Sequence, residues 1–241
     1  PNNFGWGFII MGISMGLGIL VYLFYNVGNK TDKTPHKTIA VFWQDTKNII
    51  KSHVNFRRYL LSRILITAHF PAMSLYAVYT QELFGFNISE AGVFIVLQVI
   101  TFSLGSVASG KIGDHWGHKT AIIFSFSGYL LAIIFTIFAT SMIHVYAIFL
   151  SLGLGHGGFM PSAMNMVYEF AESRDSKTYM ALIDTFLAPF VLLMIIGASV
   201  LNPIIGTHNL FVLAGFLIAI GLLLLTFWVK EPRFHPYKAI D

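Results

Sequence analysis

The stretch Gly110-Lys111-Ile112-Gly113-Asp114-His115-Trp116-Gly117-His118-Lys119 is short and charged. An apolar run of about 20 residues lies on each side of it, and a run of that length is typical of a membrane-spanning helix. A charged turn between two such runs predicts a membrane hairpin, in which the chain leaves the bilayer, reverses and enters it again. Gly110 and Gly117 would let the backbone turn tightly and approach its neighbours closely.

Outward from this hairpin, the sequence contains seven apolar runs of about 22–24 residues, each long enough to cross a hydrocarbon layer of ~30 Å. The runs cover residues 4–25, 59–80, 88–110, 120–143, 145–168, 178–200 and 207–229. The composition agrees, because 56% of the 241 residues are hydrophobic and only 11% are charged, whereas soluble domains average about 25% charged residues. No cysteine is present, which excludes disulfides and cysteine-ligated metal sites within this chain. The sequence therefore predicts an all-α, polytopic membrane protein with seven transmembrane helices.

All 15 Lys and Arg residues fall on one side of this predicted topology. They lie before or just inside the second run, in the hairpin, between the fifth and sixth runs, and after the last run. The alternate connections, at 81–87, around His144 and at 201–206, contain none. Because basic loops remain in the cytoplasm, we predict a multi-pass protein of the cell membrane, with its long linker and C-terminus cytoplasmic. Topology thus accounts for the net charge of +4, and no nucleic-acid partner is expected.

The long polar segment at 26–57 is predicted to be a cytoplasmic linker that contains an amphipathic helix on the membrane surface. Six side chains of this segment fall near helical spacing on one face. They are Ile39, Phe42, Trp43, Thr46, Ile49 and Ile50. A loose linker is the alternative.

The chain is then divided into a first span (1–25), the linker, a bundle of six spans (58–230) and a cytoplasmic tail (231–241).

The hairpin resembles the signature loop of the major facilitator superfamily of transporters, Gly-x-x-x-Asp-Arg-x-Gly-Arg-Arg/Lys. The matching residues are Gly110, Asp114, Gly117 and Lys119. Histidine stands at two positions where the family usually has arginine, His115 and His118. The order of one span, a basic linker and six further spans resembles the sixth span, the central linker and the second half of such a transporter. The resemblance implies one bundle of 3+3 inverted repeats, a partner N-terminal half of the same transporter that is missing from this chain, and a substrate path between the halves.

The resemblance also implies that the hairpin is a cytoplasmic gate. Asp114 would face a helix N-terminus, where free N–H groups and the helix dipole favour a carboxylate. It would latch the two halves in one state, with Lys119 as a supporting charge. Histidines are mostly neutral at pH 7, so this latch is expected to be weaker than the family's, or to strengthen on acidification. A solvated turn with only a topological role and a metal site at His115-x-x-His118 are the alternatives.

Polar side chains inside the predicted spans are costly there, so each is a candidate for the substrate or proton pathway. The candidates are His69, Tyr76, Gln98, His156 and Asp184. By the resemblance, the spans of the two histidines line the central cavity, and a mid-membrane histidine can titrate near neutral pH and carry a proton. Alternatively, each histidine is neutral and bonded to a backbone carbonyl, and Asp184 is a cap or pairs with Arg174 or Lys177.

Two further features concern the same spans. Arg63 lies near the cytoplasmic end of its span and is expected to extend towards the surface. Pro161 cannot donate a hydrogen bond to the carbonyl of Gly157, so we expect a kink and a flexible, glycine-flanked segment beside His156.

These observations favour a secondary active transporter that moves a small solute by rocker-switch alternating access, with proton coupling as a candidate mechanism. Its partners would be the small-molecule substrate, the lipid bilayer and the missing half, and no cofactor is expected. A seven-helix receptor and a membrane-embedded enzyme are the alternatives. A retinal protein is excluded because no lysine lies inside a span, and the nine histidines form no dense cluster of the kind a metalloenzyme needs.

Overall fold

The computed structural model describes residues 4–24, 38–172 and 176–235. Every described element is a helix, so the all-α prediction is confirmed. The elements are α1 (Phe4–Phe24), α2 (Ile39–Ser52), α3 (Val54–Ile66), α4 (His69–Phe84), α5 (Ile88–Trp116), α6 (His118–Ile137), α7 (Met142–Ala171), α8 (Ser176–Trp228) and the 3₁₀ turn η1 (Pro232–Phe234). The chain divides into two units, 1–38 and 39–241. In the first, α1 is an apolar helix without a charged residue.

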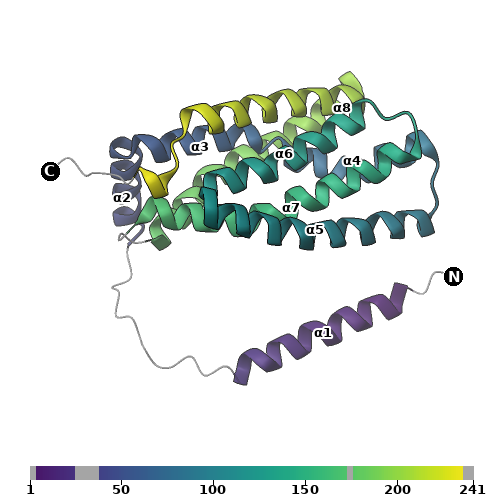
Figure 1. The fold of residues 1–241 in the computed structure, drawn as a ribbon, viewed down its shortest axis with the longest axis horizontal. Coiled ribbons are helices and arrows are strands. Elements are labelled where there is room, and N and C mark those ends of the chain that lie inside the picture. The colour runs from purple at the N-terminus through teal and green to yellow at the C-terminus, as the bar shows by residue number, and fades with distance from the viewer. Residues whose placement is uncertain (1–3, 25–37, 173–175, 236–241) are drawn as a thin grey trace. The chain divides into compact units, whose positions relative to one another are not determined.

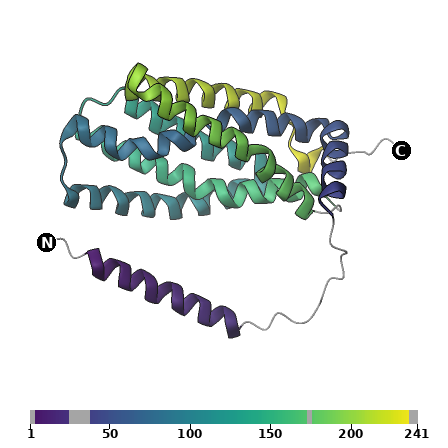
Figure 2. The ribbon, with the colours of Figure 1, turned by 180° about the vertical axis from the view of Figure 1, so that it is seen from behind.

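Five stretches of the described chain are long and apolar enough to cross a membrane: α3 with α4, α5, α6, α7 and α8. The 53 residues of α8 would extend about 80 Å if straight, far more than a ~30 Å hydrocarbon layer. Instead, α8 reverses at Gly206, where φ is 81° and ψ is 157°. Its two arms run side by side in both views (Figures 1 and 2). The apolar runs at 178–200 and 207–229 therefore lie on separate arms.

Two boundaries differ from the sequence prediction. The run at 120–143 is not one helix, because α6 ends at Ile137 and α7 begins after Ser141, whose backbone is extended. The hairpin is also shorter than expected, since α5 remains helical to Trp116 and Gly117 alone separates it from α6. With φ at 90°, Gly117 occupies a region that residues with a Cβ rarely adopt. The 29 residues of α5 extend about 43 Å, so this helix is longer than the hydrocarbon layer is thick.

Glycines bring α7 into close contact with both α5 and α6. A Cβ at Gly157 would overlap the backbone carbonyl oxygen of Phe102 on α5. A Cβ at Gly155 would lie 2.9 Å from the backbone carbonyl oxygen of Ser125 on α6. Small residues of this kind allow the backbones of membrane helices to approach each other. The glycine run around His156 therefore serves helix packing.

The helix α7 also continues through Pro161. Proline leaves the carbonyl of Gly157 without its helical donor, and the hydroxyl of Ser106 on α5 donates to that oxygen over 2.8 Å. One turn further on, Ser109 donates to the carbonyl of Gly158 over 2.8 Å. The helix therefore continues through Pro161, and the carbonyl that proline leaves free is bonded to a neighbouring helix.

At one end of the bundle, α2 crosses the ends of the long helices (Figures 1 and 2). Along the predicted apolar face, Thr46 is buried and Ile49 and Ile50 pack against the core, whereas Ile39 and Trp43 are exposed. Just beyond α2, Phe56 stacks edge-on against Phe170 of α7 and Tyr179 of α8, with ring centroids 5.2 and 5.0 Å apart. These aromatic rings join three helices beneath α2.

Candidate functional site

A cavity of about 800 Å³ lies between α3, α7 and α8. Most of its walls are apolar, and Tyr59, Phe70 and Phe159 give it aromatic surface. Arg63 and Asp184 are the charged side chains among the described residues that line it. Small-molecule sites typically combine apolar walls with a small number of polar groups in this way. This cavity is therefore the candidate substrate site.

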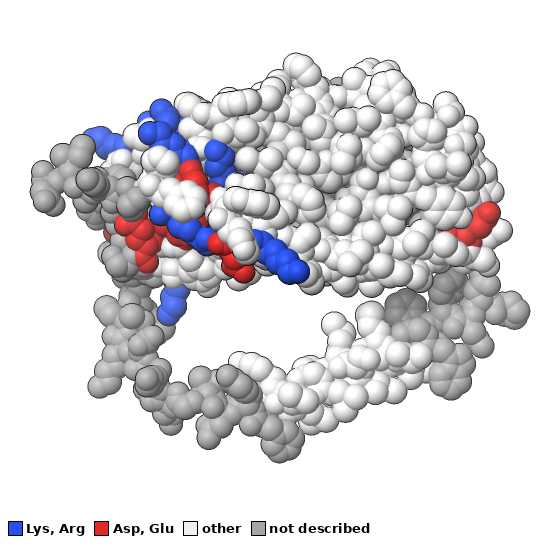
Figure 3. All heavy atoms as spheres, viewed as in Figure 1, with Lys and Arg blue, Asp and Glu red and all other residues white. Residues whose placement is uncertain are grey.

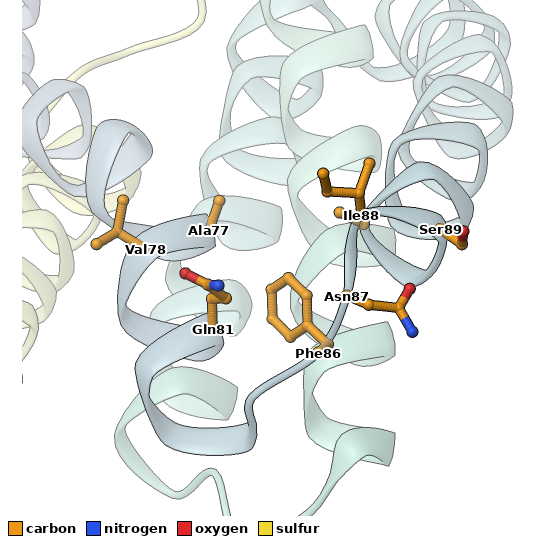
Figure 4. Close-up of a pocket in the computed structure, with 8 residues that line it drawn as sticks. Ala77, Val78, Gln81, Phe86, Asn87, Ile88 and Ser89 are labelled. Carbon is orange, nitrogen blue, oxygen red and sulfur yellow. The ribbon is translucent and has the colours of Figure 1, made fainter. Parts of the chain in front are cut away.

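A second hollow, of about 580 Å³, lies where α4 joins α5 (Figure 4). None of the described residues that line it is charged, and its polar side chains are Gln81, Asn87 and Ser89. Asn87 is already engaged as the N-cap of α5, because it accepts from the N–H of Glu90 while Glu90 accepts from the N–H of Asn87. Helix capping thus explains the polar residue at this position, and the hollow offers no charged group to a ligand.

In the cavity, Arg63 is buried, with 7% of its surface exposed. Its guanidinium carbon lies 4.7 Å from the ring centroid of Phe159, 5.3 Å from that of Phe126 and 5.7 Å from that of Tyr59. Nη1 donates to the Tyr59 hydroxyl over 2.9 Å. The side chain does not extend to the surface as the sequence predicted. It is held among aromatic rings instead, where a cation is attracted to the ring faces.

Tyr129 of α6 links the two predicted histidines. The ring of His69, which lies at the joint between α3 and α4, stacks on the Tyr129 ring with centroids 4.7 Å apart. The Tyr129 hydroxyl and His156 Nδ1 are 3.2 Å apart, a hydrogen-bond distance. His69 is buried and its Nδ1 lies 2.7 Å from the carbonyl oxygen of Ile66. The structure thus brings His69 and His156 together through one tyrosine, although the two do not line the cavity described above.

The other three pathway candidates lie apart from one another. Tyr76 is buried in the core, with its ring 4.9 Å from that of Phe211. Gln98 is half-buried on α5. Asp184 is exposed and lines the cavity. Of the predicted pathway residues, Asp184 alone shares the cavity with Arg63 among the described lining residues.

Charged side chains gather at the end of the bundle where α2 and η1 lie (Figure 3). Arg233 joins three elements there. Its Nη1 donates to the backbone carbonyls of Gly113 and Asp114 in the last turn of α5, each over 3.0 Å. Its Nε and Nη2 each lie 2.9 Å from Glu169 Oε1 near the end of α7. The residues after α8 therefore hold the hairpin to α7, and we call this group the charge cluster.

Glu231 and Lys119 complete the charge cluster. The Lys119 N–H, in the first turn of α6, donates to Glu231 Oε2 over 3.0 Å, and the Lys119 ammonium donates to the Thr226 carbonyl in the last turn of α8 over 2.7 Å. Each contact places a charge at the favourable end of a helix dipole. Gly117 is required for space as well as for its φ, because a Cβ there would overlap the Glu231 carboxylate.

The carboxylate at the N-terminus of α6 is thus Glu231, and not Asp114. Asp114 is exposed, and of its atoms the backbone carbonyl oxygen is the one bonded to Arg233. His118 is buried 3.8 Å from Glu169, whereas His115 is exposed. Gly110 has open space at its Cβ position. Within the described part of the chain no group of three potential metal ligands is found.

Glu231→Gln is expected to reduce a pH dependence of stability. Burial and the neighbouring Glu169 carboxylate raise the pKa of Glu231, which lies beyond the last residue of α8, from 4.5 to about 7. Because the folded protein then binds this proton more tightly than the unfolded chain, its stability falls as the pH rises from about 4.5 to about 7. Glutamine resembles the protonated carboxyl and removes this contribution.

The measurement is the thermal unfolding temperature of the purified protein between about pH 5.5 and pH 7.5, a range set by this titration. The wild type should lose more stability across this range than Glu231→Gln. The control is Glu82→Gln, which removes an exposed carboxylate from the last turn of α4. This variant should show the same pH dependence as the wild type. Equal pH dependence in Glu231→Gln and wild type would contradict the prediction.

Comparison with known proteins decides the family. The profile of the Major Facilitator Superfamily matches residues 2–186 and 59–240. The chain belongs to the Major Facilitator Superfamily. It is thus a multi-pass membrane protein from a family of transporters rather than enzymes, and the resemblance seen in the hairpin is confirmed at the level of the family.

Three relatives in this superfamily are named as transporters. The niacin transporter NiaP of Acinetobacter baylyi is 28% identical over 127 residues, 53% of this chain and 29% of that protein. The 4-hydroxybenzoate transporter PcaK of Pseudomonas aeruginosa is 27% identical over 166 residues, 66% of this chain and 36% of that protein. The PcaK of A. baylyi is 29% identical over 167 residues, 66% of this chain and 35% of that protein. The chain therefore spans about a third of the length of the relatives that it matches.

Sequence reasoning missed the partners that lie far along the chain. Glu231 and Arg233 contact residues 112 and 120 positions earlier, and no local pattern marks such a pairing. Tyr129 is 27 residues from His156 and reads as an ordinary aromatic residue in an apolar run. The sequence did contain a signal for Arg63. A charged side chain inside a membrane span costs free energy, so an arginine there indicates a functional role.

Proposed function

We propose that this chain is the second half of a secondary active transporter, together with the span and linker before it. Residues 1–25 would be the last span of the first half and 26–57 the cytoplasmic linker. Residues 58–230 would form a six-helix bundle of 3+3 inverted repeats, giving seven transmembrane helices in all, and 231–241 the tail. The position of the hairpin supports this assignment, since it lies between the second and third of six spans when the two arms of α8 count separately.

The proposed orientation places the charge cluster in the cytoplasm. Lys and Arg gather at that end of the bundle in Figure 3, while acidic residues are seen at the opposite end. The positive-inside rule then puts the linker, the hairpin and the tail on the cytoplasmic side of the cell membrane. The hairpin residues Gly110, Asp114, Gly117 and Lys119 would act there as a gate. Asp114 is exposed, so its carboxylate would be available to an N-terminal half.

The proposed substrate is a small aromatic acid. The observation that supports this proposal is the cavity between α3, α7 and α8, whose walls are aromatic and apolar. The relatives of the chain are named as transporters of niacin and 4-hydroxybenzoate. Both compounds are small aromatic carboxylic acids. Rocking of two bundles about this cavity would expose it to each side of the membrane in turn.

The test is uptake by the native polypeptide that carries this chain, reconstituted in vesicles. Radiolabelled 4-hydroxybenzoate or niacin should accumulate when a pH gradient is imposed, and a protonophore should abolish the accumulation. No uptake of either compound would contradict the proposed substrate class. The intact mass of that polypeptide tests the assignment to a second half, which requires about twice the mass of this chain.

His156→Ala is expected to reduce pH-driven uptake to about the rate seen without a gradient. The reason is the hydrogen-bond distance of 3.2 Å between His156 Nδ1 and the Tyr129 hydroxyl, which gives a titratable histidine inside the bundle a partner for proton transfer. Tyr129→Phe keeps the stacked ring but removes the hydroxyl, and should show a smaller loss in the same direction. An unchanged response to the pH gradient in His156→Ala would rule out the proton role, whatever its effect on the total rate.

A further inference from the structure

We propose that Arg63 is the anchor for the carboxylate of the substrate, and that the substrate ring lies against the apolar wall of the cavity beside Phe159. This inference rests on the proposed function and specifies its binding site. It concerns an arginine that the sequence places near the membrane surface and that the structure places in a buried cavity wall.

The first argument is unused hydrogen-bonding capacity. Arginine remains protonated in proteins and carries five N–H donors. Among the described residues, the Tyr59 hydroxyl is the acceptor assigned to Arg63, and the buried Nε has none. A buried charge is normally paired with an opposite charge or fully hydrogen-bonded. The surrounding rings attract the cation through their faces, but they provide no acceptor for its remaining N–H groups.

The second argument is that no carboxylate of the described chain fills this role. Asp184 lines the same cavity, yet it is exposed, and no ion pair joins it to Arg63 within the described residues. Glu169 belongs to the charge cluster, where it pairs with Arg233. The cavity thus contains a cation with free donors, and within the described part of the chain no carboxylate, Asp184 included, forms an ion pair with it.

The third argument is the chemistry that suits this site. A carboxylate matches the planar guanidinium, because both can form two parallel hydrogen bonds. The remaining walls include Phe70, Phe159, Met160 and Leu187. Such walls suit a flat apolar ring, since aromatic rings and the sulfur of methionine make favourable contacts with it. A sugar would leave most of its hydroxyl groups without partners here. The site is therefore matched to a monocarboxylate on an aromatic ring.

The experiment compares each acid with its amide, which keeps the ring and removes the charge. Binding of 4-hydroxybenzoate, 4-hydroxybenzamide, nicotinate and nicotinamide to the detergent-solubilised native polypeptide is measured by calorimetry. The wild type should bind each acid about 100-fold more tightly than its amide, because a site that bonds a charged group discriminates against ligands lacking it. In Arg63→Gln the acid should bind about as weakly as the amide, while affinity for the amide should change little. Arg63→Lys keeps the charge but not the planar fork, and should retain a small preference for the acid.

Arg58→Gln is the matched control. Arg58 lies on the same helix and also packs its guanidinium on an aromatic ring, 5.3 Å from the Trp228 centroid, but it does not line the cavity. This variant should keep the wild-type ratio of acid to amide affinity. If Arg63→Gln does not fold, the test is the acid-to-amide affinity ratio of Arg63→Lys, which should be well below that of the wild type.

Three outcomes would overturn the inference. If Arg63→Gln or Arg63→Lys keeps the full preference for the acid while uptake occurs, Arg63 is not the anchor and the proposed function survives. If Arg58→Gln loses the preference equally, the effect belongs to net charge and not to the cavity. If the wild type neither binds nor transports any of the four compounds, the proposed substrate class fails together with the anchor.

Discussion

Gly157→Ala is expected to abolish transport and to lower the thermal unfolding temperature of the purified protein. The added methyl group would overlap the backbone carbonyl oxygen of Phe102. A backbone atom cannot rotate away as a side chain can, so α5 and α7 must move apart. Overpacking of this kind costs about 1–3 kcal/mol, and separation of the helices also weakens the bond from Ser106 to the Gly157 carbonyl.

The measurement is a thermal melt of the detergent-solubilised protein, with uptake measured in parallel. Gly197→Ala is the control for the intrinsic effect of the substitution, because nothing lies within 4 Å of its Cβ position. A Gly→Ala change inside a helix without a steric conflict favours the helix by about 1 kcal/mol, so the control should be as stable as the wild type or more so. Wild-type stability and uptake in Gly157→Ala would show that the two helices are not packed as closely as described.

Arg233→Gln is expected to open the charge cluster and to release the hairpin. The change leaves Glu169 beside the Glu231 carboxylate without its cation, and the Gly113 and Asp114 carbonyls without their donor. Loss of a charged hydrogen-bond partner at a buried group costs about 1–3 kcal/mol or more. Arg233 is partly exposed, so the lower part of that range applies. The larger effect should be on the conformational balance, because the cluster joins α5, α6, α7 and the end of α8.

Hydrogen–deuterium exchange of backbone amides measures this opening. The Lys119 amide, which donates to Glu231, should exchange at least about tenfold faster in Arg233→Gln, which corresponds to about 1.4 kcal/mol of lost protection. Lys111→Gln removes a charge from an exposed position of the same hairpin and should leave exchange unchanged. Equal acceleration in both variants would mean that net charge, and not the contacts of Arg233, controls the hairpin.

How far the sequence predicts this structure depends on the range of each interaction. Apolar runs report burial in lipid directly, so the helices and the position of the hairpin follow from composition and length. The predicted role of Asp114, a latch between two halves at a helix N-terminus, stays a prediction. The carboxylate that lies at the N-terminus of α6 is Glu231, which the sequence did not indicate because it is 112 residues from Lys119.

The glycines of α7 show a second kind of ambiguity. A glycine-rich helix with a proline is consistent with a hinge or with close packing, and the sequence does not contain the neighbour that decides between them. Here the neighbour is α5, whose Ser106 satisfies the carbonyl freed by Pro161. The same reasoning applies to Arg63. Its guanidinium lies in the cavity wall and not at the surface because the rings of Phe126 and Phe159, on two other helices, attract it there.

The charge cluster also has a consequence for biosynthesis. The first turn of α6 leaves the ribosome 112 residues before Glu231, which at typical synthesis rates is roughly 6–22 s. During that interval the amide of Lys119 has no carboxylate to bind, and the hairpin has no Arg233 to hold it. The contacts of Glu231 and Arg233 with α6 and α5 can therefore form only after these late residues have been synthesised. A nascent chain that stops at Trp228 would contain α1 to α8 and still lack the contacts that Glu231 and Arg233 make with α5, α6 and α7.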